Sequence, residues 1–290
     1  MRLAASTNLF AVRYDGFTSY VESIKRCKES GFQVIDVNFC SSLRGVGDLA
    51  SENWEALIYE LRNEGEKLNL EFNQSHPVFV SKDIRQASVE EQEDYDRMMR
   101  RSILASSILG VKWAAFHPVE EKQLTLYDID ASVRKNREYF DPYVELAVKN
   151  NVGIAFENMI EDSSNKRRFS SHAGELVVLV ESYNDPLVGA CWDFGHGNRL
   201  YQDQTVALRT LGQHLKATHI NDNNGTADDH MFPFHGTIDW HKIMPVFKEI
   251  GYMGDFTYEA HNEFNKLPEH LKDSLAKCGY EIGMYCLSLA

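Results

Sequence analysis

The sequence lacks the features that mark several classes of protein. None of its hydrophobic runs approaches the roughly 18 residues that a membrane-spanning helix needs, and the N-terminal stretch has no apolar segment followed by a cleavage site. The five cysteines are scattered and form no CxxC pair, which argues against a disulfide framework and against a thiolate zinc site. We therefore expect a soluble, cytoplasmic protein with no membrane partner, whose N-terminus forms the first strand of the fold.

Basic residues are also scarce relative to acidic ones. The chain has 30 lysines and arginines against 43 aspartates and glutamates, a formal net charge of −13. Because nucleic-acid binding depends on cationic contacts to phosphates, this balance argues against a nucleic-acid partner. One tight basic cluster occurs at residues 166–168, which is either a solvated loop or a contact for a phosphate or carboxylate of a substrate. From this cluster we take Arg167 as a candidate substrate-binding residue.

No linker rich in proline, glycine or serine divides the chain, and it contains no repeat, so we expect one domain over residues 1–290. Short β-rich runs alternate with longer amphipathic stretches, which is the pattern of βα units around a parallel sheet. The sequence therefore predicts an α/β fold, a single (β/α)8 TIM barrel. The predicted strands are residues 2–6, 32–39, 68–73, 112–116, 152–156, 187–192, 216–220 and 256–258. The predicted helices are residues 51–67, capped by Ser51, and 90–109, 131–149, 173–181, 241–249 and 268–289, with a short helix after the sixth strand.

Ionisable side chains recur at or near the carboxyl ends of the predicted strands. They are His76, His117, Glu157, Asp193, His219 and Glu259, spaced by between 26 and 41 residues. Any one of them could merely cap a helix or bond to a loop amide. The carboxyl ends of the strands of such a barrel converge on one rim, however, and that rim is where these folds build their sites. Six such residues together predict one shared site.

The acidic members of this set follow apolar runs directly. Glu157 follows GIAF and Asp193 follows GACW, at the edge of a packed interior where a charge is costly unless it is paired or bound to a metal ion. Carboxylates combined with neutral imidazoles suit catalytic divalent cations, and the absence of a cysteine in the set argues against a structural zinc. We predict one divalent metal ion, with Mn²⁺ as the first choice and Mg²⁺, Co²⁺ or Zn²⁺ as alternatives.

Six short motifs are similar to those of a known family. They are FHP (116–118), FEN (156–158), WDFGHGN (192–198), HINDNNG (219–225), DDHMFPFHGTIDW (228–240) and YEAH (258–261). With these motifs, in this order and over most of the barrel, the chain resembles the xylose-isomerase-like sugar and sugar-phosphate isomerases and epimerases, which share a superfamily with endonuclease IV. This resemblance implies that the metal ligands are Glu157, Asp193, His219 and Glu259.

The resemblance also implies a reaction. The substrate would be a small sugar, sugar phosphate or keto-sugar that loses a proton from a carbon next to its carbonyl, and the metal ion would stabilise the resulting enediolate. Glu157 and Glu259 would be the catalytic carboxylates, which remove and return the proton on opposite sides of that carbon. His196 would lie beside the ion and donate a hydrogen bond to a substrate oxygen.

The stretch after His219 contains more histidine and acid than such an epimerase needs. We predict that His230 and His235 in this stretch, together with His76 and His117, contact the substrate. His261 is assigned to a surface helix or loop from which it could line the mouth of the site. The glutamate and arginine that contact the sugar in ketose 3-epimerases correspond here to Ser163 and Gly225, so the particular sugar is left open.

Other functions stay open at this stage. Endonuclease IV uses nine ligands for three zinc ions, and each has a counterpart here: His76, His117, Glu157, Asp193, His196, His219, Asp228, His230 and Glu259. The acidic net charge argues against a nuclease that acts on abasic DNA. The aromatic side chains predicted around the site also argue against it, because they suit a compact organic substrate: Phe79, Trp113, Phe194, Phe232 and Phe234. A lyase or dehydratase of a keto-sugar could use the same metal site. A non-catalytic partner subunit is a further alternative, and a homo-oligomer is compatible with the sequence.

Overall fold

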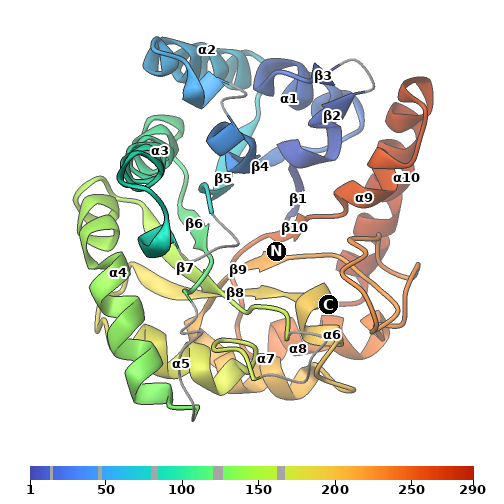
Figure 1. The fold of residues 1–290 in the computed structure, drawn as a ribbon. Coiled ribbons are helices and arrows are strands. Elements are labelled where there is room, and N and C mark those ends of the chain that lie inside the picture. Colours follow the sequence, from blue (N-terminus) through green and yellow to red (C-terminus); the bar gives the residue numbers. More distant parts are fainter. Residues whose placement is uncertain (14–15, 45–47, 80–83, 120–126, 162–166) are drawn as a thin grey trace.

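Eight parallel strands form the centre of the fold (Figure 1). The structure is a computed structural model that describes residues 1–13, 16–44, 48–79, 84–119, 127–161 and 167–290. The strands are β1 (Leu3–Ser6), β4 (Val34–Asn38), β5 (Glu71–His76), β6 (Trp113–Phe116), β7 (Gly153–Glu157), β8 (Val188–Asp193), β9 (Leu215–His219) and β10 (Phe256–Tyr258). They pair in the order β10-β1-β4-β5-β6-β7-β8-β9, and every pair is parallel. All eight predicted strands are confirmed.

The sheet closes on itself between β9 and β10. Ile220, directly after β9, forms a parallel bridge with Tyr258 of β10. The Ile220 amide donates to the Thr257 carbonyl at 2.7 Å, and the Glu259 amide donates to the Ile220 carbonyl at 3.0 Å. The predicted TIM barrel is therefore confirmed.

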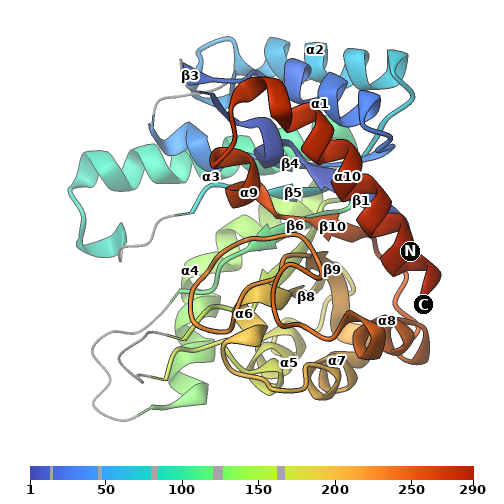
Figure 2. The same ribbon diagram turned by 90° about the vertical axis from the view of Figure 1, so that its right-hand side faces the viewer.

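Helices surround the barrel on its outside (Figures 1 and 2). They are α1 (Tyr20–Glu29), α2 (Trp54–Lys67), α3 (Val89–Leu109), α4 (Ile129–Lys149), α5 (Ala173–Glu181), α6 (Phe194–Asn198), α7 (Thr205–Leu211), α8 (Trp240–Glu249), α9 (His261–Asn265) and α10 (Glu269–Ser288). A short hairpin, β2 (Val12–Arg13) with β3 (Gly16–Phe17), follows β1. The helices predicted by residue range are confirmed to within three residues at each end, as is the short helical connection after the sixth strand. In the described part of the chain, no helix combines the length and the hydrophobicity that crossing a membrane requires.

The start of α2 corrects one prediction. The helix begins at Trp54, after Asn53, and no side chain caps it. Ser51 does not cap the helix because its hydroxyl bonds to the Asn53 side chain instead.

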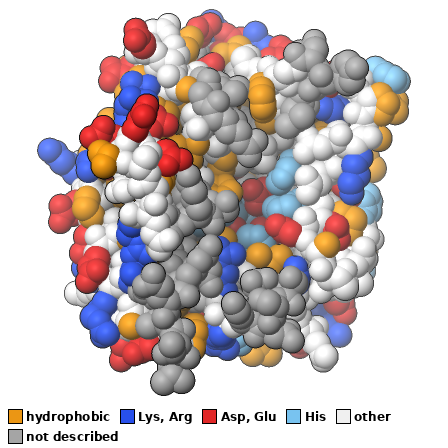
Figure 3. Space-filling view, viewed as in Figure 1, with side chains coloured by type: hydrophobic (Ala, Val, Ile, Leu, Met, Phe, Trp, Pro, Cys, Tyr) orange, Lys and Arg blue, Asp and Glu red, His pale blue; other side chains and the backbone are white. Residues whose placement is uncertain are grey.

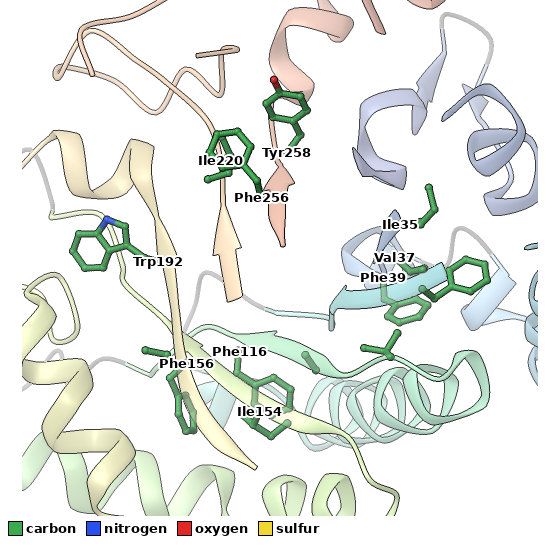
Figure 4. Close-up of a cluster of buried hydrophobic side chains, with 14 of the residues drawn as sticks. Ile35, Val37, Phe39, Phe116, Ile154, Phe156, Trp192, Ile220, Phe256 and Tyr258 are labelled. Atoms are coloured by element: carbon green, nitrogen blue, oxygen red, sulfur yellow. The ribbon is translucent and has the colours of Figure 1, made fainter. Parts of the chain in front are cut away.

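Side chains alternate between the two faces of the barrel strands, as the pleat requires. The outward side chains are large, among them Val37, Phe116, Phe156 and Trp192, each at most 1% exposed, and they pack toward the surrounding helices (Figure 4). A separate cluster of buried residues is mostly small and comprises Trp113, Ala115, Ala155, Cys191 and Ala217. Because most of these side chains are short, they leave room on the barrel axis for the longer polar side chains at the strand ends.

Candidate active site

The residues predicted to share a site do lie at the carboxyl ends of their strands. His76, Glu157, Asp193 and His219 are the last residues of β5, β7, β8 and β9, while His117 and Glu259 directly follow β6 and β10. The third predicted strand ended too early, because β5 continues through His76 itself. Histidine and acidic side chains gather near the centre of the face that Figure 3 shows.

The four predicted metal ligands, which we call the quartet, are Glu157, Asp193, His219 and Glu259. One ligand atom of each lies within 4.8 Å of the ligand atoms of the other three. His219 Nδ1 is 3.1 Å from Glu157 Oε1 and 3.5 Å from Glu259 Oε2. Ligand atoms bound at about 2.1 Å on opposite sides of one ion are roughly 4 Å apart, so a small contraction would let the quartet hold a single ion.

Unpaired polar atoms in the quartet support this fit. Both carboxylate oxygens of Glu157 and both ring nitrogens of His219 are buried, and none of them forms a well-aligned hydrogen bond with the residues that the structure describes, although Glu157 lies close to His219 and His117. Buried polar atoms are almost always hydrogen-bonded, and burying an unpaired charge costs several kcal/mol. A divalent cation among these atoms would satisfy the carboxylate oxygens and Nδ1 of His219, so the residues present fit a metal ion.

The two glutamates of the quartet have different electrostatic environments. Burial alone would raise the pKa of Glu157, but His219 and His117 outweigh it and hold that pKa well below its usual range. Burial raises the pKa of Glu259 to about 7. Without a metal ion, the two glutamates therefore differ in their affinity for a proton.

Two asparagines that the sequence analysis missed hold Asp193 in place. The Asn221 amide donates to Asp193 Oδ2 at 2.7 Å, and the Asn158 side chain bonds to both the amide (2.6 Å) and the carbonyl (2.9 Å) of Asp193. The His196 amide donates to Asp193 Oδ1 at 2.7 Å. Both asparagines belong to the motifs FEN and HINDNNG, and this motif membership was the signal that could have found them.

The support of Asp193 leads to a prediction about Gly195. A Cβ at this position would lie 1.8 Å from Asn221 Oδ1, so Gly195→Ala forces Asn221 away from Asp193. Because partners that orient a ligand typically change metal affinity by 10–100-fold, we expect Gly195→Ala to weaken Mn²⁺ binding by about tenfold or more. Competition with a chelator measures this affinity. The matched control is Gly174→Ala on α5, where a Cβ meets nothing within 4 Å; equal affinities in the two variants would contradict the prediction.

His76 and His117 form a second group with Glu157. Their Nε2 atoms are 3.0 Å apart, and they lie 3.7 and 3.2 Å, respectively, from Glu157 Oε2. His76 Nδ1 donates to the Pro77 carbonyl at 2.9 Å, which leaves its Nε2 directed at Glu157. The Phe79 ring covers this group, 4.2 Å from the ring centre of His117. The structure thus brings both predicted histidines to the quartet.

A third group comprises His196, Asp228 and His230. Asp228 Oδ2 is 3.6 Å from His196 Nε2 and 3.2 Å from His230 Nε2. The Nδ1 atoms of the two histidines donate to the carbonyls of Asn158 and Glu259, both at 2.8 Å. Fixing Nδ1 in this way orients Nε2 of each ring toward Asp228, as in histidines that bind metal ions.

The Asp222 side chain holds the stretch after β9 in a conformation that folds back over the site. Its carboxylate accepts hydrogen bonds from Trp240 Nε1 at 2.9 Å and from the amides of Phe234 (3.1 Å) and Ile238 (3.2 Å). Its backbone pairs with Met231 in an antiparallel bridge. Asp222 therefore ties both ends of this stretch together, and the segment between them carries Asp228 and His230 to the third group.

Two predicted substrate-binding residues make their contacts elsewhere. His235 contacts Glu263, with 2.6 Å between His235 Nδ1 and Glu263 Oε1, and 43% of the His235 side chain is exposed. Arg167 pairs with Glu175 at 2.5 Å and lies over the Tyr127 ring. Their roles toward a substrate stay predictions, and Ser163 and Lys166 lie outside the described residues.

The prediction that aromatic side chains surround the site was wrong for most of them. Phe194 packs against Trp240 in the core, and Phe232 packs against Tyr258. Phe234 packs against Tyr285 on α10, and Trp113 begins β6, at the other end of that strand from His117. Of the five, Phe79 does contact the site histidines. The aromatic side chains therefore no longer argue against a nuclease, whereas the net negative charge of the chain still does.

His261 lies closer to the site than the predicted surface helix or loop would place it. It forms a group of potential ligands with His230 and Glu259, and its ring centre is 4.4 Å from that of His230. The sequence signal was its position two residues after Glu259.

Comparison with known proteins gives a family and several structural relatives. A model of the family described as xylose isomerase-like TIM barrel matches residues 24–278. An uncharacterized protein of Methanocaldococcus jannaschii is 25% identical over 265 residues, which covers 89% of this chain and 85% of that protein. An uncharacterized protein of Sinorhizobium fredii is 31% identical over 121 residues, which covers 42% of this chain and only 37% of that protein.

Solved structures resemble the fold over nearly the whole chain. A D-tagatose 3-epimerase-like protein superposes with a TM-score of 0.76 at 18% identity, covering 100% of this chain and 98% of that one. The IolI protein with a zinc atom superposes with a TM-score of 0.76 at 16% identity. The match covers 99% of this chain and 98% of that one. The 3-keto-D-glucoside 4-epimerase YcjR of E. coli superposes with a TM-score of 0.70 at 14% identity. The match covers 97% of this chain and 99% of that one. At these identities the likeness is one of fold.

Proposed function

This chain belongs to the xylose isomerase-like TIM-barrel family, and from that premise we propose that it is a divalent-metal-dependent isomerase or epimerase of a small carbohydrate. The observation that carries the proposal is the quartet, whose four ligand atoms lie mutually within 4.8 Å at the carboxyl ends of the strands. Proteins of similar fold include a D-tagatose 3-epimerase-like protein, a 3-keto-D-glucoside 4-epimerase and IolI with a zinc atom, which supports a sugar substrate and a metal ion.

Glu157 and Glu259 would carry the proton transfer. A divalent ion held by the quartet would polarise the substrate carbonyl and stabilise the negative charge that develops on the substrate oxygens. The two glutamates come from β7 and from the end of β10, strands that are not neighbours in the barrel, so their carboxylates can flank one substrate carbon. One glutamate takes the proton from the carbon next to the carbonyl, and the other returns a proton from the opposite side.

The surrounding histidines would hold the substrate. His76, His117, His196 and His230 lie next to the quartet and offer ring nitrogens to substrate hydroxyl groups. His235 and Arg167 lie against Glu263 and Glu175 and would contact the distal part of a larger or phosphorylated sugar. We propose Mn²⁺ as the ion, with Mg²⁺, Co²⁺ or Zn²⁺ as alternatives. All five cysteines are free, which fits a cytoplasmic protein.

Hydrogen exchange tests this function without a guess at the product. The protein with Mn²⁺ is incubated in D₂O with a panel of ketoses, their phosphates and keto-glycosides, and deuterium on carbon is followed by NMR. We expect metal-dependent incorporation at one carbon next to the carbonyl of at least one sugar. Loss of a substituent from that sugar would identify a lyase or dehydratase instead, and no exchange across the panel would contradict the proposal.

A second candidate function, cleavage of abasic DNA, is favoured by one observation. The structure brings all nine predicted counterparts of the endonuclease IV ligands to the quartet and its two flanking groups. Metal content separates the two functions: we expect one ion per chain for the sugar enzyme and three for the nuclease, measured by elemental analysis after dialysis. Because the chain carries a net charge of −13, we expect no incision of an abasic-site duplex. Three ions together with incision would favour the nuclease.

A further inference from the structure

The proposed metal ligand Asp193 stands where the chain changes direction abruptly. It is the last residue of β8, and α6 begins directly after it at Phe194. Its carboxylate caps this short helix by accepting the His196 amide at 2.7 Å. Because a strand and a helix meet at this one residue, a small rotation of the backbone there would turn the carboxylate away from the quartet. The contacts that hold the two neighbours of Asp193 therefore help to decide where its carboxylate points.

One buried side chain, that of Gln204, bonds to both neighbours of Asp193. Gln204 Oε1 accepts a hydrogen bond from Trp192 Nε1 at 2.9 Å, and Gln204 Nε2 donates to the Phe194 carbonyl at 2.9 Å. Gln204 directly precedes α7 and is 4% exposed. Since Trp192 points outward from β8 (Figure 4), Gln204 reaches this part of the chain from outside the barrel.

The amide of Gln204 can satisfy both partners in one orientation alone. An indole N–H only donates and a carbonyl only accepts, so Oε1 must face Trp192 and Nε2 must face Phe194. Both of these partner residues are fully buried. Without Gln204 the single N–H of the Trp192 indole would be left unpaired in the core, which native structures rarely tolerate.

Gly197 leaves the room that this contact needs. A Cβ at Gly197 would lie 2.4 Å from Gln204 Oε1 and 2.8 Å from Trp192 Cζ2. The motif WDFGHGN therefore carries, besides Asp193 and His196, a glycine that lets the Gln204 amide approach.

Two sets of contacts thus act on Asp193 from opposite sides. Asn158 and Asn221 bond to Asp193 itself. Gln204 bonds instead to the residues directly before and after it. Groups that orient a metal ligand in this indirect way typically change metal affinity by 10–100-fold.

We propose that Gln204 is a positioning residue that fixes the chain on both sides of Asp193 and thereby aims the Asp193 carboxylate at an ion in the quartet. This inference rests on the proposed metal site and adds to it a residue from outside the barrel.

Metal affinity tests the role of Gln204. Gln204→Met keeps the length of the side chain and removes both hydrogen bonds, and we expect it to bind Mn²⁺ 10–100-fold more weakly than the parent in competition with a chelator. Gly197→Ala, which crowds Gln204 Oε1, should weaken binding by about tenfold. The matched control is Asn136→Leu, because the buried Asn136 amide on α4 bonds in the same two-sided way to the Val119 amide (2.8 Å) and carbonyl (3.0 Å), away from the quartet. Its Mn²⁺ affinity should stay within about threefold of the parent.

Removal of Asp193 separates positioning from a general loosening of the fold. If Gln204 acts through Asp193, then adding Gln204→Met to Asp193→Ala should change the remaining Mn²⁺ affinity by less than about threefold. A general loosening would weaken binding in both backgrounds. The visible absorption of Co²⁺ gives a second readout, because it depends on the geometry of the ligands. At saturating Co²⁺ we expect a changed spectrum for Gln204→Met and the parent spectrum for Asn136→Leu.

The possible results distinguish this inference from the proposed function. Parent-like Mn²⁺ affinity in Gln204→Met would overturn the inference and leave the proposed function standing, and Gly197→Ala decides the question if Gln204→Met does not fold. An equal loss of affinity with and without Asp193 would overturn it as well. A parent that binds no Mn²⁺ would overturn the proposed function and this inference with it.

Discussion

Glu157→Gln and Glu259→Gln are each expected to lower metal-dependent exchange of the substrate's carbon-bound proton by about a thousandfold or more. Each substitution removes a carboxylate that faces His219 Nδ1 at 3.1 or 3.5 Å and that would transfer the proton. An amide cannot act as a general base, and the loss of a general base alone costs about 10²–10⁴-fold. The measurement is the rate of deuterium incorporation into a responsive sugar at saturating Mn²⁺.

Two controls separate lost proton transfer from lost metal. Asp193→Asn removes a ligand of the quartet that has no proposed part in proton transfer, so we expect higher Mn²⁺ concentrations to restore much of its activity. The two glutamine variants should stay inactive at the same concentrations. Glu249→Gln, at the end of α8 where Glu249 forms an exposed ion pair with Arg209 of α7, should exchange at the parent rate. Parent-like exchange in either Glu157→Gln or Glu259→Gln would show that the two-carboxylate mechanism is wrong.

The barrel and the gathering of the six strand-end residues were predictable because strand pattern and strand ends are local properties of the sequence. The choice of the quartet among those six came from the family resemblance instead. A β-rich run followed at once by a charged residue, as at Phe156 and Glu157, marks both the strand and the edge of the packed interior. The parallel arrangement of βα units then brings every such residue to one rim without any knowledge of loop structure. His76 shows the limit of this reasoning, since the end of β5 was misplaced while its functional residue was still found.

The surroundings of the site were less predictable because loops have no periodicity. The Glu263 carboxylate accepts a hydrogen bond from the Phe232 amide and contacts the His235 ring. Glu263 lies about 30 residues after both of them in the chain, so no local sequence pattern shows that His235 has a partner outside the quartet. Phe194 and Phe232 stand beside site motifs in the sequence, yet both are fully buried in the core.

Removal of the metal ion is expected to produce the largest change in the stability of the protein. The quartet places three carboxylates around His219 with ligand atoms within 4.8 Å of one another, so we expect the folded protein to bind the proposed ion far better than the unfolded chain does. An ion present at about 1,000 times its dissociation constant stabilises the fold by about 4 kcal/mol. At about 2 °C per kcal/mol for a chain of this size, the melting temperature should fall by roughly 8 °C on treatment with EDTA.

Thermal unfolding with Mn²⁺ or with EDTA measures this difference. The same pair of measurements on Glu157→Gln should show a much smaller difference, because that variant lacks the glutamate that is nearest to His219 Nδ1. Glu249→Gln should show the full difference of the parent. Equal melting temperatures of the parent in Mn²⁺ and in EDTA would mean that the quartet holds no ion under these conditions, and the metal-dependent function would then lose its physical basis.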